Sequence, residues 1–234
     1  MGYTKITALS LTDLFVQQIE NMILSGELPV GEQLPAAREL SARMGVSRPV
    51  ISAGLTQLEK MGFVEIRPRQ GVFISDYRRR GTVETLVAIM RYNSGAMRKN
   101  EVKSLLETRQ SLECLCMKLV IENALHEELE ALAPILDELA GCDDCDAAAE
   151  LVFRFHHELA VLSGNVLLPL MYYSFKPQSI YLWSLYCRNN SVRALYDIKL
   201  RLYRAILNRD TEESVRQTQE VMAAALDDLA VYGI

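Results

Sequence analysis

Basic side chains between residues 37 and 80 are the first group in this sequence whose type and spacing suit a defined chemistry. The segment carries nine lysines and arginines against four acids, whereas the whole chain has a formal net charge of −5 at pH 7. Phosphate affinity depends on local cationic density and not on the charge of the whole chain. The segment is therefore a candidate phosphate-binding surface, and a merely solvated basic face is the alternative.

Two short helices and a hairpin must position these cations. Pro35 opens the first helix, Gly45 ends it, and Ser47 caps a second helix. Two helices joined by a short glycine-containing turn form a helix-turn-helix. Residues 63–66 and 71–74 are β-rich runs on either side of a basic tip, which predicts a two-stranded wing. An earlier helix over residues 11–25, with Thr12 as its cap, is expected to support the motif from behind.

This segment resembles the winged helix of the GntR family of bacterial transcription regulators. The residues that carry the resemblance are Gly31, Leu34, Pro35, Arg38, Glu39, Leu40, Gly45, Val46, Ser47 and Arg48, followed by Gly71 and Phe73. The resemblance implies binding of double-stranded DNA through the start of the second motif helix, with the wing in the adjacent minor groove. The expected DNA-binding residues are Arg38, Ser47, Arg48, Pro49, Val50, Ser52, Arg67, Arg69, Gln70 and Gly71.

One position departs from the family pattern. Relatives usually place a basic residue where this chain has Ser52. Arg38, Arg48 and the wing are therefore expected to make more of the DNA contact.

The length and composition fit two domains. The 234 residues are half apolar, which provides material for a sizeable core. We expect a DNA-binding domain over residues 1–76, a linker over 77–81 and a second domain over 82–234. No run of 18 apolar residues and no signal-peptide pattern is present, so a cytoplasmic protein without a membrane partner is expected.

The second domain reads as helices without a convincing strand. Gly164 and Asn165 are expected to end one helix with a left-handed stop. The expected helices span residues 82–91, 100–125, 126–140, 146–163, 167–176, 178–187, 191–207 and 211–232. The predicted fold class is thus mainly α, with an N-terminal winged helix-turn-helix, a two-stranded wing and a C-terminal all-α bundle of about seven helices.

This bundle is similar to the effector-binding domain of the FadR branch of the GntR family. The resemblance is carried by Glu107 and Arg109, by the step Phe155-His156, and by residues 205–210. Many members of this branch hold a divalent metal, and the corresponding positions here are Val152, His156, Lys199 and Val221. Three of these four residues cannot serve as that ligand set, so no metal and no other cofactor is expected.

A metal-free bundle of this branch resembles regulators that sense acyl-CoA, and another organic acid is also possible as the effector. Arg109 is the best candidate for an anion partner, because its guanidinium pairs with carboxylate or phosphate. Its rival role is a structural ion pair with Glu107 or Glu113. The aromatic residues between positions 171 and 186 suit the lining of a ligand cavity, and plain core packing is their alternative. The candidate effector-binding residues are Arg109, His156, Asn165, Tyr172, Trp183, Tyr186 and Lys199.

Five cysteines, an odd number, indicate reduced thiols and no disulfide framework. Cys142 and Cys145 have CxxC spacing without a second ligand pair, so a redox- or metal-responsive regulator using them or His156 is the weaker alternative. No nucleophile elbow, phosphate loop or catalytic carboxylate pair indicates an enzyme. The leading hypothesis is a homodimeric regulator that binds a near-palindromic operator and responds to a small molecule.

Overall fold

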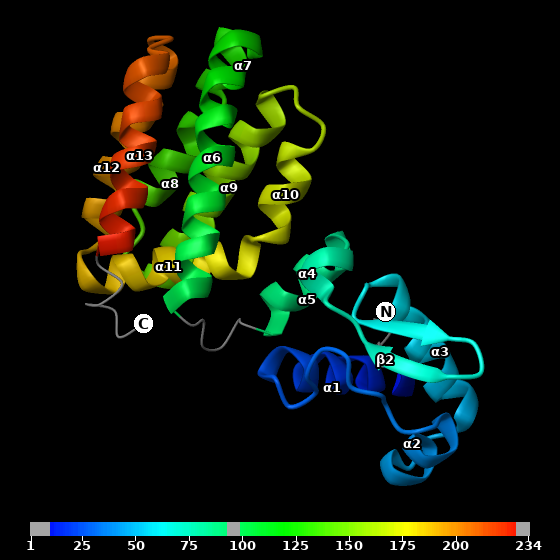
Figure 1. Cartoon of the computed structure of the whole chain (residues 1–234). Helices are drawn as coiled ribbons and strands as arrows, with labels where there is room; N and C mark the ends of the chain where they lie inside the picture. Colours follow the sequence, from blue (N-terminus) through cyan, green and yellow to red (C-terminus); the bar gives the residue numbers. More distant parts are fainter. Residues whose placement is uncertain (1–9, 93–98, 228–234) are drawn as a thin grey trace, which may run out of the picture. The chain divides into compact units, whose positions relative to one another are not determined.

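The chain divides into two compact units, residues 1–92 and residues 93–234. The computed structural model describes residues 10–92 and 99–227 of these units (Figure 1). The first unit contains a helix-turn-helix followed by a two-stranded wing, and the second consists of helices. The predicted fold class is confirmed.

Helix α1 (Leu11–Ser25) packs its apolar side into the hydrophobic core of the first unit. Ser10, not Thr12, caps it, because the Ser10 side chain accepts from the backbone N–H of Asp13 while Asp13 accepts in return. The buried side of the helix carries Phe15, Ile19 and Ile23. This helix packs against α3, as expected for a support behind the motif.

The two motif helices are α2 (Ala37–Met44) and α3 (Arg48–Lys60), joined at Gly45 in a left-handed conformation with φ of 67°. Ser47 holds the N-cap position of α3, as predicted, but its side chain makes no capping hydrogen bond. Gly54 lies in the middle of α3, where a Cβ atom would stand 2.3 Å from Cδ1 of Phe15. A glycine is needed there because α1 and α3 approach too closely for any side chain.

The wing is an antiparallel hairpin of β1 (Val64–Arg67) and β2 (Gly71–Ile74), with Val64 opposite Ile74 and Arg67 opposite Gly71. Its tip is tightened by Arg69, whose φ is 65°, and by Gly71, whose φ is 124°. Gln33 donates from Nε2 to the carbonyl oxygen of Gln70 at 2.7 Å, which ties the tip to the segment before α2.

Residues 77–92 differ from the expected linker and bundle helix. A single helical turn, α4 (Tyr77–Arg80), occupies the segment expected to be a linker, and α5 (Val83–Tyr92) follows within the first unit. Arg91 forms a 2.6 Å ion pair with the buried carboxylate of Glu20, although burial raises the pKa of that carboxyl. The Thr85 hydroxyl also donates to the carbonyl of Met61. These contacts attach α5 to the winged helix, ten residues or more beyond the boundary predicted from composition.

The described helices of the second unit are α6 (Lys99–Asn123), α7 (His126–Glu130), α8 (Ala133–Ala140), α9 (Cys145–Leu162), α10 (Leu168–Ser174), α11 (Lys176–Asn189), α12 (Val192–Leu207) and α13 (Thr211–Asp227). The segment 126–140 is two helices instead of the single one expected, because Pro134 restarts the helix after a turn at residues 131–132. The last predicted helix was expected to reach Tyr232, which lies outside the described residues.

Helix α9 is central to the bundle and packs against α11, α10, α8 and α6. Asp144 caps its start by accepting from the N–H of Ala147 at 2.7 Å, and Gly164, with φ of 72°, follows its end as predicted. Arg209 donates to the carbonyls of Ile121 and Ala124 and so closes the end of α6. In the described part of the chain, no helix is long and apolar enough to span a membrane.

Candidate nucleic-acid interface and effector cavity

The first turns of α2 and α3 present cations to solvent. Arg38 and Arg48 are exposed, and within residues 10–92 neither forms an ion pair. Arg43, in contrast, is engaged with Glu39 at 2.5 Å. Ser47, Pro49 and Ser52 are also exposed at the start of α3, while Val50 is half-buried. Arg38 at the start of α2, and Arg48 with the exposed Ser47 hydroxyl at the start of α3, suit hydrogen bonds to phosphates and base edges.

The wing residues divide into engaged and projecting groups. Arg67 pairs with Glu65 at 2.9 Å and lies 4.4 Å from the Phe73 ring centroid, so it supports the hairpin. Arg69 and Gln70 are exposed at the tip, and Arg69 forms no ion pair among the described residues. Gly71 is conformationally required, since its φ of 124° is a backbone conformation that residues with a Cβ atom rarely adopt. Arg69 is therefore an exposed cation of the wing tip that stays available to a partner.

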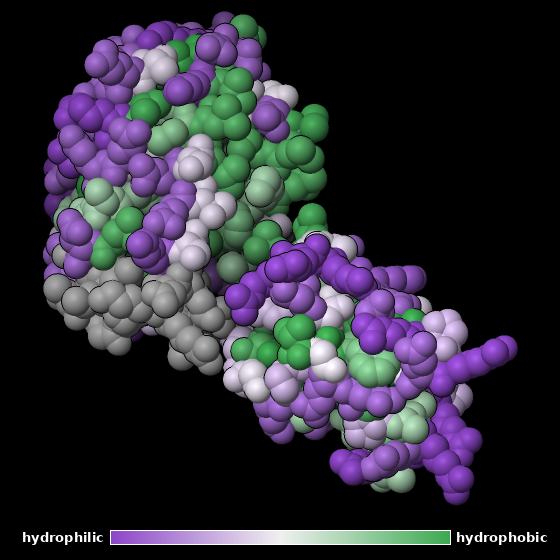
Figure 2. Space-filling view, viewed as in Figure 1, coloured by the Kyte–Doolittle hydropathy of each residue, from purple (hydrophilic) through white to green (hydrophobic). Residues whose placement is uncertain are grey.

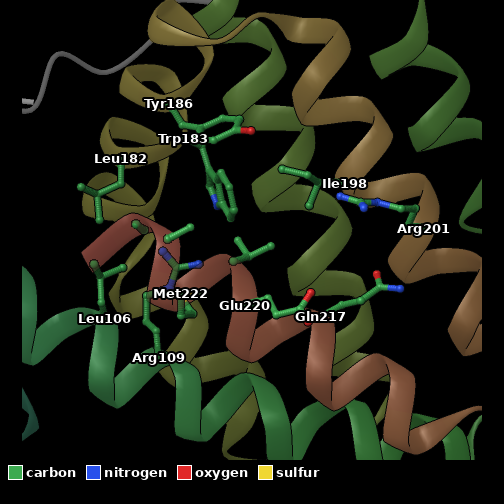
Figure 3. A pocket seen from close by; sticks show the side chains of 13 residues that line it. Leu106, Arg109, Leu182, Trp183, Tyr186, Ile198, Arg201, Gln217, Glu220 and Met222 are labelled. Carbon is green, nitrogen blue, oxygen red and sulfur yellow. The ribbon is translucent and has the colours of Figure 1, made fainter. Parts of the chain in front are cut away.

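The bundle contains a cavity of about 240 Å³ between α6, α11, α12 and α13 (Figure 3). Its lining is mainly apolar, and its polar groups are few. In Figure 3 the Arg109 side chain of α6 extends toward the Trp183 ring of α11, while Arg201 and Glu220 approach from α12 and α13. The lining residues are Leu106, Arg109, Leu182, Trp183, Tyr186, Ile198, Arg201, Gln217, Glu220, Val221, Met222, Ala224 and Ala225. A mainly apolar cavity with a few charged groups is the usual form of a small-molecule site.

Arg109 is held by a buried ion pair. Its Nη2 lies 2.6 Å from Oε1 of Glu113, and the two side chains are only 6% and 3% exposed. This is one of the two structural pairings left open by the sequence; Glu107 instead lies 3.7 Å from Lys103. Since a guanidinium has five N–H donors, the bond to Glu113 leaves donors for a ligand in the cavity.

His156 and Lys199 contact each other and the ring of Trp183. Nζ of Lys199 lies 3.0 Å from Nε2 of His156 and 3.9 Å from the centroid of the Trp183 ring, against which His156 is stacked. Burial, reinforced by Lys199 and Arg109, holds the pKa of His156 well below its usual range, so the ring is neutral. When Lys199 is protonated, Nε2 of His156 accepts from it, and the ring proton then lies on Nδ1. Nδ1 is 3.7 Å from Glu113 and makes no hydrogen bond within the described residues.

Burial also acts strongly on Lys199. It lowers the pKa of the ammonium from 10.5 to about 7, although Glu113 opposes the shift while Arg109 adds to it. The side chain is 2% exposed. Lys199 therefore changes its charge near neutral pH, which few lysines do.

The remaining candidate residues lie in different places. Tyr186 lines the cavity, and Tyr172 is buried beside Arg109 with a hydroxyl that lacks a hydrogen bond within the described residues. Burial and the charge of Glu113 raise the pKa of Tyr172 well above its usual range. Asn165 lies apart from the cavity and accepts from the N–H groups of Leu167 and Leu168 at the start of α10. The structure thus brings Arg109, His156, Trp183, Tyr186 and Lys199 together, whereas Asn165 stabilises the turn that leads into α10.

Several cavity residues were not anticipated from the sequence. Glu220, Gln217 and Met222 come from α13, and Arg201 comes from α12. Their only available signal was helical spacing: Arg201 stands three residues after Ile198 on one face of α12, and α13 has one polar and one apolar face. Such a pattern predicts an amphipathic helix but does not distinguish a cavity wall from a core contact.

Two family models match this chain. The model described as bacterial regulatory proteins, gntR family, matches residues 12–74, and the FCD domain model matches residues 104–224, about half the chain. The chain belongs to the GntR family. A GntR winged helix joined to an FCD effector-binding domain makes it a transcription regulator, and the named relatives are likewise regulators and not enzymes.

Relatives of this GntR-family chain extend over most of its length. The HTH-type transcriptional regulator LutR of Bacillus subtilis is 29% identical over 195 residues, which cover 79% of this chain and 85% of LutR. A fatty acid metabolism regulator protein of Shewanella pealeana is 31% identical over 158 residues, covering 68% of this chain and 64% of that protein. The solved structure of Lar, which controls the Listeria monocytogenes agr system and mediates virulence, aligns with a TM-score of 0.60 at 15% identity, over 94% of this chain and 97% of Lar. The last likeness shows the fold alone.

The donor set of this GntR-family chain does not suit a metal. Of the four family ligand positions, Val152 and Val221 have no donor atom and Lys199 brings an ammonium beside His156. Within residues 10–92 and 99–227, no cluster of three His, Cys, Asp or Glu side chains could hold a metal ion. An ammonium donates hydrogen bonds and repels a cation, so the remaining histidine has no ligand partner.

The CxxC cysteines lie where α9 begins. Cys142 contacts the carbonyl of Asp144 through its Sγ at 3.2 Å, and Cys145 is the first residue of the helix. Burial and the neighbouring Cys145 raise the pKa of the Cys187 thiol to about 12. The Cys187 thiol, which neighbours Cys145, is therefore poorly suited to form the thiolate that redox chemistry requires.

Proposed function

We propose that this GntR-family chain is a homodimeric regulator that binds a near-palindromic operator and whose operator affinity is set by a small organic acid in the FCD cavity. The observation that carries the proposal is Arg109, a buried cation in the wall of an apolar cavity, whose guanidinium hydrogen-bonds to Glu113 alone among the described residues. Such a group pairs with a carboxylate, and the apolar lining accommodates the rest of the acid. A regulator that binds operator DNA would act in the cytoplasm.

The cavity size favours a small acid over acyl-CoA. Pockets for drug-sized ligands span roughly 300–1,000 Å³, and this cavity is about 240 Å³. An acyl-CoA carries a nucleotide and several phosphates, whereas among the described residues two arginines line this cavity. The relative named for fatty acid metabolism supports a link to carboxylic acids in general.

A thermal-shift comparison tests the ligand class. Acetate, butanoate, hexanoate and octanoate are added separately to the protein, beside their neutral amides and beside the matching CoA thioesters. At least one carboxylate is expected to raise the melting temperature, because only the folded state offers the cavity and its arginine. Stabilisation by the thioesters alone would overturn the assignment of a small acid.

The DNA surface proposed here consists of Arg38, Ser47, Arg48, Pro49, Val50 and Ser52 on the motif helices and Arg67, Arg69, Gln70 and Gly71 on the wing. The motif-helix group would contact phosphates and base edges, while Arg69 and Gln70 would enter the minor groove. Arg67 would support the wing through Glu65 and Phe73 more than it would touch DNA.

Operator affinity is expected to fall steeply with salt. If each subunit of the dimer neutralises about three to five phosphates, affinity should drop roughly 10³- to 10⁵-fold between about 50 and 200 mM salt. The operator is first selected from random duplexes, and affinity is then measured by fluorescence anisotropy across that range. A flat response would exclude direct phosphate contact.

A dimerisation surface is available on the bundle. Apolar residues gather over α6 and α10 in the view of Figure 2. The exposed apolar side chains of α10 and of the segment before it include Leu170 at 65% exposure and Val166 at 80%. Leu115, Leu167 and Tyr173 are also exposed. A contiguous apolar surface of this kind marks an interaction site, and a second copy of the chain is the partner that a near-palindromic operator requires.

The variant Leu170→Glu is expected to produce monomers, because the carboxylate would be buried in the proposed interface. The dimer dissociation constant should rise roughly a hundredfold or more. Light scattering coupled to size-exclusion chromatography gives the mass, and Val30→Glu, which alters an exposed valine of the first unit, is the control. A dimeric mass for Leu170→Glu would remove α10 from the interface.

A further inference from the structure

An uncompensated buried charge lies next to the effector cavity. Arg109 and Glu113 neutralise one another across 2.6 Å, and His156 is neutral. Lys199 is enclosed at 2% exposure, and no carboxylate forms an ion pair with it within the described residues. When Lys199 is protonated, the cluster carries one surplus positive charge. A buried charge without a counter-ion is costly, so this cluster suits a ligand with one negative charge.

Lys199 also has unused hydrogen-bonding capacity. An ammonium has three N–H donors. One is directed to Nε2 of His156 at 3.0 Å, and the Trp183 ring lies 3.9 Å from Nζ. No other acceptor within the described residues bonds to Nζ. At least one donor therefore remains for an additional acceptor.

Space for that acceptor exists beside Nζ. A void of about 10 Å³ is lined by Lys199, Glu113 and His156, and it shares Gln217 and Val221 with the 240 Å³ cavity. A void of this size is near the limit for a single water molecule or oxygen atom. The shared residues place the void beside the cavity, so a carboxylate near Nζ would lie next to the apolar lining.

We infer that Lys199 and Arg109 together receive the head group of a singly charged carboxylic acid, whose apolar part fills the cavity, and that each acid is bound together with a proton on Lys199. This inference rests on the proposed function and adds the charge of the ligand, its second partner and the proton. The two cations approach the same indole, since the Arg109 guanidinium carbon lies 6.0 Å from the Trp183 centroid. A dianion would exceed the single surplus charge.

The charged groups around Lys199 agree with proton uptake. Helix α6 brings Arg109 and Glu113, α9 brings neutral His156, and α13 brings uncharged Gln217 and Thr218 to the void. Arg201 and Glu220 stand at the wall of the larger cavity with opposite charges. Burial lowers the pKa of Lys199 to about 7, so the free protein is increasingly neutral at this residue above that pH. A carboxylate raises the pKa of a neighbouring ammonium, and by linkage its own affinity rises as the pH falls.

Isothermal titration calorimetry tests the proton directly. Acetate, butanoate, hexanoate and octanoate are titrated into the whole protein at about pH 6 and about pH 8, in buffers of low and high ionisation enthalpy. Binding at the higher pH should take up close to one proton per acid, and affinity should be roughly tenfold lower there than at the lower pH. The acids stay ionised across this window, so the pH effect belongs to the protein.

The variant Lys199→Met removes the ammonium while keeping a long side chain. It should lose the proton uptake and bind the acid at least roughly tenfold more weakly at the lower pH. Arg204→Met is the matched control, because it removes an exposed cation from the same helix outside the cavity. If Lys199→Met does not melt cooperatively, Lys199→Gln takes its place.

The possible results separate the inference from the proposed function. Proton uptake by the wild type and by Arg204→Met, but not by the Lys199 variant, supports the inference. Acid binding that takes up no proton, or that persists unchanged in the Lys199 variant, overturns it and leaves the proposed effector class standing. If none of the four acids binds the wild type at either pH, the proposed effector class and this inference both fail.

Discussion

Replacing Arg48 with alanine is expected to weaken operator binding by about 1–3 kcal/mol at each half-site, and hence by roughly 2–6 kcal/mol for a dimer. Arg48 is exposed in the first turn of α3 and has no ion-pair partner within the described residues, so the guanidinium is available to a base edge or phosphate. The effect should be large because Ser52 stands where relatives carry another cation. Fluorescence anisotropy with the selected operator measures the loss.

Arg43→Ala is the matched control for Arg48→Ala. Arg43 is an exposed arginine of the same unit, but its guanidinium is paired with Glu39 at 2.5 Å. Its removal should change operator affinity much less than the removal of Arg48. Equal losses in the two variants would indicate general electrostatic attraction, and no loss in Arg48→Ala would exclude α3 as the reading helix.

Replacing Arg109 with methionine should abolish the response to the acid and also destabilise the bundle by roughly 3–5 kcal/mol, because Glu113 would remain buried without its partner. The side chains of the pair are 6% and 3% exposed, so solvent cannot compensate for the loss. Urea unfolding followed by circular dichroism measures the stability. Calorimetry with the same carboxylates measures the response.

The double variant Arg109→Met, Glu113→Met separates these two effects. Removing both partners of a buried ion pair is often neutral or stabilising, so the double variant should recover the stability of the wild type. It should still bind no acid, since the guanidinium is absent. Recovery of acid binding in the double variant would show that Arg109 acts only on folding.

The winged helix was predictable because its signals are local. Gly45 between two apolar-periodic helices and Gly71 in a short hairpin determine the motif within few residues. The attachment of α5 was not predictable, since it depends on the ion pair between Glu20 and Arg91, which are far apart in sequence. Composition marked residues 77–81 as a linker because arginine-rich segments are usually solvated, whereas the fold forms a helical turn there.

The cavity shows a similar division between local and distant information. Arg109 and Glu113 are spaced by one helical turn, so their pairing was foreseen as one of two options. The approach of Lys199 to His156 joins helices 43 residues apart, and no periodicity specifies it. Asn165 was predicted to bind the effector because it belongs to a family motif, but in this structure its side chain stabilises the turn before α10. Helical spacing identifies buried faces, but only packing decides which of them surround a cavity.

Operator affinity measured with and without the acid tests the central claim most directly. The operator is the duplex selected from random DNA, the acid is the carboxylate with the largest thermal shift, and the proteins are the wild type and the Arg109→Met, Glu113→Met double variant. The acid should change wild-type operator affinity by roughly five- to 150-fold and leave the double variant unchanged. An equal change in both proteins, or none in the wild type at saturating acid, would contradict control of DNA binding through this cavity.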